Sequence, residues 1–239
     1  MAFGYHRLRI LVHKGVPINY LEKFKEYPLT YTLMGINIVV FIIVSINTNW
    51  EETLYMSGVL HGYSVVVKEE YYRLFTSIFL HADAMHIVMN MLSLYMVGRM
   101  VEKLFSPFAY LSLYFISALF GSYASIYIHL EGQAVGASGA IFGLFGALAG
   151  FAFVHRNTMR NQFVSFMKDF GVILLINLVI GVVVPNIDMS AHIGGLVAGM
   201  IGGVMVAKNP KFIWLYLLLA LLLLPLINNY ISTLYAKFL

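Results

Sequence analysis

The chain has 239 residues, of which 60% are apolar and only 11% are charged, and its mean hydropathy is +0.82. This composition excludes an ordinary soluble globular domain and is typical of a protein that crosses a membrane several times. Cysteine is absent, which excludes disulfides and thiolate chemistry. The net charge of +4 does not indicate nucleic-acid binding, because the basic residues cluster in alternate short loops, as membrane orientation requires.

Seven apolar segments follow a charged amino-terminal stretch. Residues 1–28 lack the apolar region of a cleavable signal peptide, and we expect a cytosolic tail too short to hold a separate soluble domain. The long loop between the first and second spans, up to about residue 83, is expected to contain partial helix and interfacial burial. The spans are expected at residues 29–48, 84–101, 108–128, 138–154, 169–185, 189–207 and 212–229.

These segments predict an all-α fold, a polytopic membrane helical bundle. Its core would contain six helices over residues 29–207, and residues 208–239 would supply a seventh transmembrane helix and the carboxyl end. With a cytosolic amino terminus, all Lys and Arg residues except Lys68, Arg73 and Lys237 lie on the cytosolic side. The positive-inside rule therefore favours this orientation, with the carboxyl terminus on the outer side of the membrane.

Two predicted helices carry faces of small residues. In water, interior glycines weaken a helix, but in lipid they let two helix backbones approach closely. The fourth and sixth spans are therefore expected to pack tightly against each other. The first face consists of Gly139, Gly143, Gly146 and Gly150, and the second of Ala191, Gly195, Gly199 and Gly203.

Polar residues stand at the start of the second, fourth and sixth spans. In the predicted topology these three helices begin on the same side, so His86, Asn90, Ser138 and His192 should lie at one depth. Singly, each has a simpler interpretation: a packing serine, a structural histidine, or an interhelical polar contact. Together, Ser138 and His192 fit a nucleophile and its general base, since a hydroxyl needs a base within hydrogen-bond reach.

His86 and Asn90 are four residues apart and share one helix face. Both can donate hydrogen bonds to an oxyanion, and the backbone N–H of Ser138 offers a third donor. His81 would be rotated by about 140° from His86 on a helix, and it is interpreted as a structural donor that holds the outer loop. No H-E-x-x-H motif occurs, so neither a metal nor a cofactor is expected.

The fourth span is short, and at about 16 residues it would be less than the apolar thickness of a bilayer. Ser138 should therefore lie below the outer surface, with the preceding residues, Gly132 to Ala137, dipping in after it. Irregular backbone at that depth must line a cavity, which hydrolysis also requires. Asp169 and Asp188 are not obviously placed to orient His192, so the sequence predicts a dyad rather than a triad.

These motifs resemble those of the rhomboid intramembrane serine proteases. G-A-S-G at 136–139 is similar to the family's nucleophile motif, A-H-I-G-G at 191–195 to its base motif, and His81, His86 and Asn90 to its H-x4-H-x3-N second span. The resemblance covers about residues 72–203. It implies Ser138 as nucleophile, His192 as general base and an oxyanion hole of His86, Asn90 and the Ser138 amide.

The resemblance also implies supporting roles and exposes two departures. Gly136 would form the turn into the oxyanion hole, Gly139 completes the nucleophile motif, and Gly195 and Gly199 would fit the small-residue face of the sixth span. Tyr72-Arg73 stands where the family often has Trp-Arg, so the loop anchor is altered. Phe142 replaces a common tyrosine, yet it can still stack on the histidine ring, so activity is expected to survive.

By resemblance, the partners would be single-span transmembrane proteins within the lipid bilayer, cut near its outer face. The seventh span resembles the six-plus-one arrangement of some bacterial members, which indicates a prokaryotic plasma membrane. Two other classes stay open. A catalytically inactive relative would bind or escort membrane clients, and a transporter would use the polar residues as an ion path, although these stop near one face.

Overall fold

The computed structural model describes residues 25–46, 51–158 and 188–237, together with positions 164, 168, 171, 172, 175 and 179. Apart from four of those positions, the predicted fifth span at 169–185 lies outside the described residues, as does most of the amino-terminal tail. The long described helices are α2 (Pro28–Ile46), α7 (Ala84–Leu104), α8 (Pro107–Ile128), α9 (Ser138–Val154), α11 (Met189–Lys208) and α12 (Phe212–Tyr235).

The predicted helical membrane bundle is confirmed. Within the described ranges, α2, α7, α8, α11 and α12 are long and apolar enough to cross a membrane, while α9 has only 17 residues, as its short apolar segment predicted. The starts of these helices agree with the predicted spans within one residue. Helix α12 continues six residues beyond the predicted end at 229, because polar residues such as Asn228 and Ser232 do not stop a helix that packs against other segments.

Capping residues explain where several helices begin. The Asp83 carboxylate accepts a hydrogen bond from the backbone N–H of His86 at 2.8 Å and starts α7. Ser106 caps α8, directly before Pro107, where a missing N–H is harmless. Asp188 caps α11 through the backbone N–H groups of Ser190 and Ala191. Helix α9 has no such side-chain cap.

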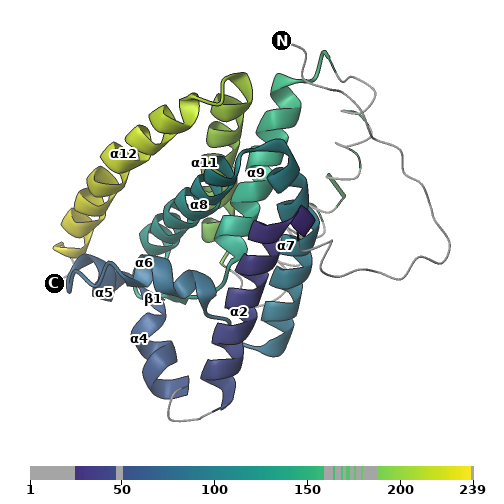
Figure 1. Cartoon of the computed structure of the whole chain (residues 1–239). Coiled ribbons are helices and arrows are strands. Elements are labelled where there is room, and N and C mark those ends of the chain that lie inside the picture. Colours follow the sequence, from purple (N-terminus) through teal and green to yellow (C-terminus); the bar gives the residue numbers. More distant parts are fainter. Residues whose placement is uncertain are drawn as a thin grey trace.

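The long loop between α2 and α7 forms one end of the bundle, which we call the loop end (Figure 1). It holds partial helix, as expected, and also a strand of two residues that pairs antiparallel with β2 (Gln133–Ala134). This pairing was not predicted, because two residues carry no periodicity and their partners are distant in the sequence. The loop elements are η1 (Glu51–Tyr55), α4 (Met56–Gly58), β1 (Leu60–His61), α5 (Gly62–Val66), α6 (Arg73–Thr76) and η2 (Ser77–Phe79).

Helix α9 is the centre of the core, with α8 on one side and α11 on another (Figure 1). The side chains of Ala140, Leu144 and Ala147 are fully buried. Because α9 is enclosed by protein from Gly139 to Leu148, its apolar side chains there pack against other helices, while Phe153 near its end is exposed.

The glycine faces of α9 and α11 interlock as predicted. A Cβ atom added at Gly195 would collide with the carbonyl oxygen of Gly139, and one at Gly199 with that of Gly143. From the other side, a Cβ at Gly150 would lie 2.6 Å from the carbonyl oxygen of Met200. Backbone therefore packs against backbone along both helices, which fixes their relative position more firmly than contacts between flexible side chains would.

This interlock predicts opposite outcomes for two Gly-to-Ala substitutions. Gly199→Ala places a methyl group against the Gly143 carbonyl, and we expect a loss of about 3 kcal/mol in unfolding free energy from overpacking. Gly35→Ala on α2 meets no atom within 4 Å, so the higher helix propensity of alanine should leave stability unchanged or raise it by up to about 1 kcal/mol. Thermal unfolding of both variants in detergent measures the difference. Equal melting temperatures for the two would contradict the interlock.

Candidate active site

Ser138 is the first residue of α9 and follows a turn that only glycine can make easily. Gly136 has φ of +120°, a region that L side chains rarely adopt. Its N–H donates to the carbonyl oxygen of Ser77 at 2.9 Å. A Cβ at Gly136 would lie 2.7 Å from His86 Nε2 and 3.9 Å from Asn90 Nδ2. The turn into Ser138 is therefore held by the loop and lies directly against two predicted oxyanion donors.

His192 lies in the first turn of α11, with 6% of its surface exposed. Its ring stacks on Phe142, one turn after Ser138, with centroids 4.2 Å apart and planes within 7°. This is the stacking expected for phenylalanine in place of tyrosine. The ring orientation of His192 is thus fixed by an apolar partner from the helix that begins at Ser138.

The turns that carry Ser138 and His192 are in contact through their neighbours. The ideal Cβ position of Gly139 lies 3.5 Å from the carbonyl oxygen of Ala191. Within the described residues, no hydrogen bond joins the Ser138 hydroxyl to His192, and His192 Nδ1 has no partner. Catalytic hydrogen bonds of this kind often tighten only when substrate binds.

Asp188 lies close in sequence to His192 but is occupied elsewhere. Its carboxylate accepts from the N–H groups of Ser190 at 3.0 Å and Ala191 at 3.2 Å, and from the Ser190 hydroxyl. Burial raises the pKa of this carboxyl, but hydrogen bonds from Ser125, Ser190 and Ala191 outweigh burial and hold the pKa below its usual range. Asp188 thus stabilises the start of α11, a role that its position before Met189-Ser190 could have indicated.

His86 and Asn90 lie against the Gly136 turn, and His81 lies beside His86. The rings of His81 and His86 are 5.1 Å apart and meet edge to face at 69°, so the predicted separation by 140° is wrong. Its premise fails because α7 begins only at Ala84, which leaves His81 on the preceding segment. Among the described residues neither ring nitrogen of His81 has a hydrogen-bond partner, so the predicted role of His81 as a donor that holds the loop is wrong as well. Asn90 is buried, and its Nδ2 donates to the His86 carbonyl at 2.9 Å, which leaves a second amide hydrogen for another acceptor.

Arg73 lies in the loop and not among these side chains. Its guanidinium, which is buried, donates to the carbonyl oxygens of Met56 at 2.8 Å and Val59 at 2.9 Å, and pairs with Glu70. Since this guanidinium is hydrogen-bonded to Glu70, it holds the pKa of that carboxyl below its usual range. Arg73 therefore ties the loop together just before Ser77, the residue whose carbonyl holds Gly136.

The structure thus brings together most of the residues selected from the sequence. Ser77 was missed, because its contribution is a backbone carbonyl that no side-chain pattern reveals. The groups of three histidines, aspartates or glutamates that a metal ion would need do not occur among the described residues. Gly199 packs one turn further along α9, against Gly143. The residues near the turn are Gly136, Ser138, Gly139, Phe142, His81, His86, Asn90, His192 and Gly195.

Comparison with known proteins gives these residues a context. The Rhomboid domain matches residues 68–209. The chain belongs to the rhomboid family. The matched range begins in the loop before Arg73 and ends with α11, so it includes all the selected residues and leaves out α2 and α12.

Similar proteins come from distant organisms. A rhomboid protease, GluP of Bacillus subtilis, is 37% identical over 177 residues, which are 71% of this chain and 33% of that protein. RHOMBOID-like protein 1 of Arabidopsis thaliana is 38% identical over 67% of this chain and 41% of its own length. Rhomboid-like protease 1 of Toxoplasma gondii is 30% identical over 84% of this chain and 73% of its own. The first two matches thus span well under half of those relatives.

The loop anchor of this rhomboid protein yields a stability prediction. Arg73→Ala leaves the buried Val59 carbonyl and the partly buried Met56 carbonyl without their donor, so we expect a loss of about 3 kcal/mol in unfolding free energy. Arg73→Lys should recover only part of the lost unfolding free energy, because an ammonium group lacks the planar guanidinium fork that reaches several acceptors. Arg156→Ala is the control, since that exposed arginine donates, among the residues that the structure describes, to the carbonyl of Phe153 in its own helix end. If thermal unfolding shows the same loss of stability in Arg156→Ala as in Arg73→Ala, the stabilising role of Arg73 in the loop is contradicted.

Proposed function

We propose that this rhomboid protein is an intramembrane serine endopeptidase in which Ser138 is the nucleophile and His192 the general base. The observation that carries the proposal is the Phe142–His192 stack at 4.2 Å. It couples the imidazole to the helix that begins at Ser138, and the interlocked glycines below it keep the two helices in register. A serine and a histidine on two rigid elements are what nucleophilic catalysis requires.

The chemistry follows from the residues present. His192 would take the proton of the Ser138 hydroxyl as its oxygen attacks the peptide carbonyl, and would then give that proton to the leaving amine. Water, deprotonated by His192, would then cleave the acyl–Ser138 ester, release the carboxylic acid and restore the Ser138 hydroxyl. The backbone N–H of Ser138 would be available to the oxyanion, because the first N–H groups of a helix have no partner within it. His86 and the second amide hydrogen of Asn90 would supply the further donors.

A dyad accounts for the site without a carboxylate. Among the residues that the structure describes, Nδ1 of His192 has no hydrogen-bond partner, and the nearby Asp188 is engaged in capping α11. The stack on Phe142 would do the orienting that an aspartate performs in a triad. We propose Gly136 as the turn that aims the Ser138 amide, and His81 as a buried support for the His86 ring.

The proposed substrates are single-span membrane proteins, cut near the outer face of the bilayer. Support comes from the placement of the candidate site at the loop end, which the charge distribution assigns to the outer side, with a cytosolic amino terminus. We propose the same division of the chain as the sequence analysis predicts: a tail at 1–28, a protease core at 29–207, and a seventh helix with the carboxyl end at 208–239. A prokaryotic plasma membrane fits this arrangement.

The first functional prediction is loss of cleavage in Ser138→Ala and in His192→Ala, with each variant still folded. A tagged single-span substrate in proteoliposomes gives the rate, and thermal unfolding gives the fold. Ser112→Ala is the control, because within the described part of the chain the Ser112 hydroxyl donates to the Phe108 carbonyl of its own helix. A fluorophosphonate probe should label wild type and Ser112→Ala but not Ser138→Ala. Cleavage by Ser138→Ala would overturn the proposal, and an unlabelled wild type would favour a protein that binds clients without cutting them.

The second functional prediction concerns the oxyanion hole. Asn90→Ala should lower kcat by about 10²- to 10³-fold, the usual effect of removing one oxyanion donor, while KM changes little. The variant loses its bond to the His86 carbonyl as well, so its melting temperature is measured alongside. A kcat within about twofold of wild type would remove Asn90 from this role.

A further inference from the structure

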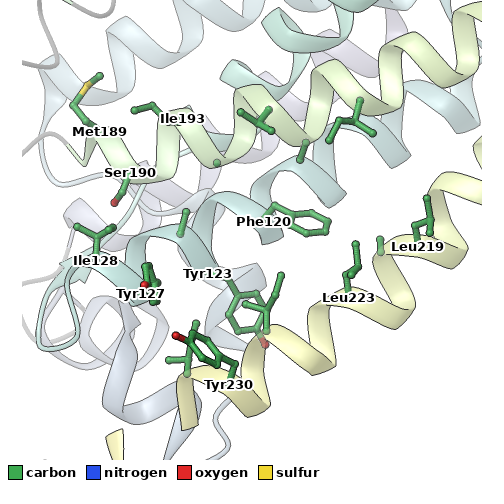
Figure 2. Close-up of a pocket in the computed structure, with 18 of the residues that line it drawn as sticks. Phe120, Tyr123, Tyr127, Ile128, Met189, Ser190, Ile193, Leu219, Leu223 and Tyr230 are labelled. Atoms are coloured by element: carbon green, nitrogen blue, oxygen red, sulfur yellow. The ribbon is translucent and has the colours of Figure 1, made fainter. Parts of the chain in front are cut away.

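Helix α12 lies outside the matched Rhomboid region, and its buried residues fall into two groups. Ile213, Tyr216 and Ala220 are buried near its start, and Ile231 and Tyr235 near its end. Between α12 and the helices α8 and α11 lies an apolar cavity of about 840 Å³. Figure 2 shows this gap, with Leu219 and Leu223 of α12 across from Phe120 of α8. This cavity separates the middle of α12 from α8 and α11. Helix α12 therefore contacts the loop end through its last turns.

The last turns of α12 complete a second apolar core, distinct from the one around α9. We call it the loop-end core, and it is made by Leu60, Val65, Val66 and Leu74 of the loop, Tyr123 and Ile126 of α8, and Ile231 and Tyr235 of α12. Leu130 and Ala134, from the segment between α8 and α9, pack against it. The segment that leads to Ser138 therefore rests on a core that α12 helps to build.

Polar contacts join the same elements. The Tyr235 hydroxyl donates to the carbonyl oxygen of Leu130. The Tyr123 hydroxyl donates to Asn228 Oδ1 at 3.2 Å, and Asn228 Nδ2 donates to the Tyr71 hydroxyl at 3.5 Å. A Cβ added at Gly62 would collide with the Tyr235 hydroxyl and would lie 2.5 Å from the Leu130 carbonyl oxygen. Helix α12, the loop and the segment before α9 thus converge on one point.

From Leu130 the contacts continue to the nucleophile. Gln133 and Ala134 pair with β1, the N–H of Gly136 bonds to the Ser77 carbonyl, and Ser138 follows. Since α9 has no side-chain cap of its own, the position of its first turn depends on these contacts of the preceding segment.

We propose that Tyr235 and Asn228 of the seventh helix are positioning residues for Ser138. Tyr235 acts through the segment at 130–136, and Asn228 acts through Tyr123 of α8 and Tyr71 of the loop. Neither residue touches a reacting atom, and this inference rests on the proposed function. A displacement of the nucleophile by about 1 Å can cost on the order of a hundredfold in rate, so a hydrogen bond at the start of this segment affects the chemistry. The seventh helix thereby becomes part of the working enzyme.

The test compares Tyr235→Phe with Tyr230→Phe. The first keeps the ring in the loop-end core and removes only the hydroxyl, while Tyr230 is exposed on the same helix. We expect Tyr235→Phe to lower kcat and the rate of fluorophosphonate labelling about tenfold or more with KM unchanged, and Tyr230→Phe to match wild type. A merely structural role would lower the melting temperature without this split between kcat and KM.

Amide hydrogen exchange makes the inference separable from the proposed function. Exchange at residues 130–137 should quicken in Tyr235→Phe and not in Tyr230→Phe, whether or not the protein cuts a substrate. Quicker exchange with unchanged kcat and labelling would overturn the positioning role, and unchanged exchange would overturn the contact itself. If the wild type is inactive but exchange is quicker in Tyr235→Phe, the proposed function and the positioning role are both contradicted, while the contact between Tyr235 and Leu130 is supported.

Two further variants test the same junction. Gly62→Ala pushes a methyl group into the Tyr235 hydroxyl and should reproduce the loss in kcat. Because both changes act on one contact, the double variant Gly62→Ala/Tyr235→Phe should be no slower than the slower single variant. Asn228→Ala should lower kcat in the same direction. Fully additive losses in the double variant would show that Gly62 and Tyr235 act separately and would contradict the proposal.

Discussion

The close approach of α9 and α11 is the constraint on which the rest of the structure depends. Each helix presents glycine to the carbonyl groups of the other, so no side chain separates the two backbones. Backbone contacts cannot relax by a change of side-chain rotamer, and the relative position of the two helices is therefore tightly constrained. Ser138 begins one helix and His192 lies in the first turn of the other, so the constraint sets the geometry of the candidate dyad.

The second requirement is a firm start for α9. The helix lacks a side-chain cap, and a glycine with positive φ stands two residues before it. Contacts from outside the helix replace the missing cap. The Ser77 carbonyl holds Gly136, the strand pair fixes Gln133 and Ala134, and Arg73 ties the loop that supplies Ser77. The loop is thus a structural part of the candidate site, although its side chains, apart from His81, lie outside it.

Much of this organisation could be predicted because it depends on residue patterns within a single helical segment. Apolar length sets the spans, the spacing of Gly139, Gly143, Gly146 and Gly150 marks a packing face, and the shortness of α9 follows from its run of apolar residues. Polar residues at span starts identified Ser138, His86, Asn90 and His192, because such groups are costly in lipid and rare without a role. Helix α12 ends at Tyr235, beyond the predicted end at 229, because its last turns pack into the loop end.

The sequence by itself determined the membrane bundle, the interlocking faces and the residue types of the candidate site, because these depend on composition and on spacing along one helix. Only the tertiary structure decided what lies between elements: the His81–His86 contact, the Ser77 carbonyl on Gly136, the two-residue strand pair and the Tyr235 hydroxyl on Leu130. Three of these four involve backbone groups, which every residue carries and no sequence pattern marks. All four join segments whose meeting depends on how the helices pack.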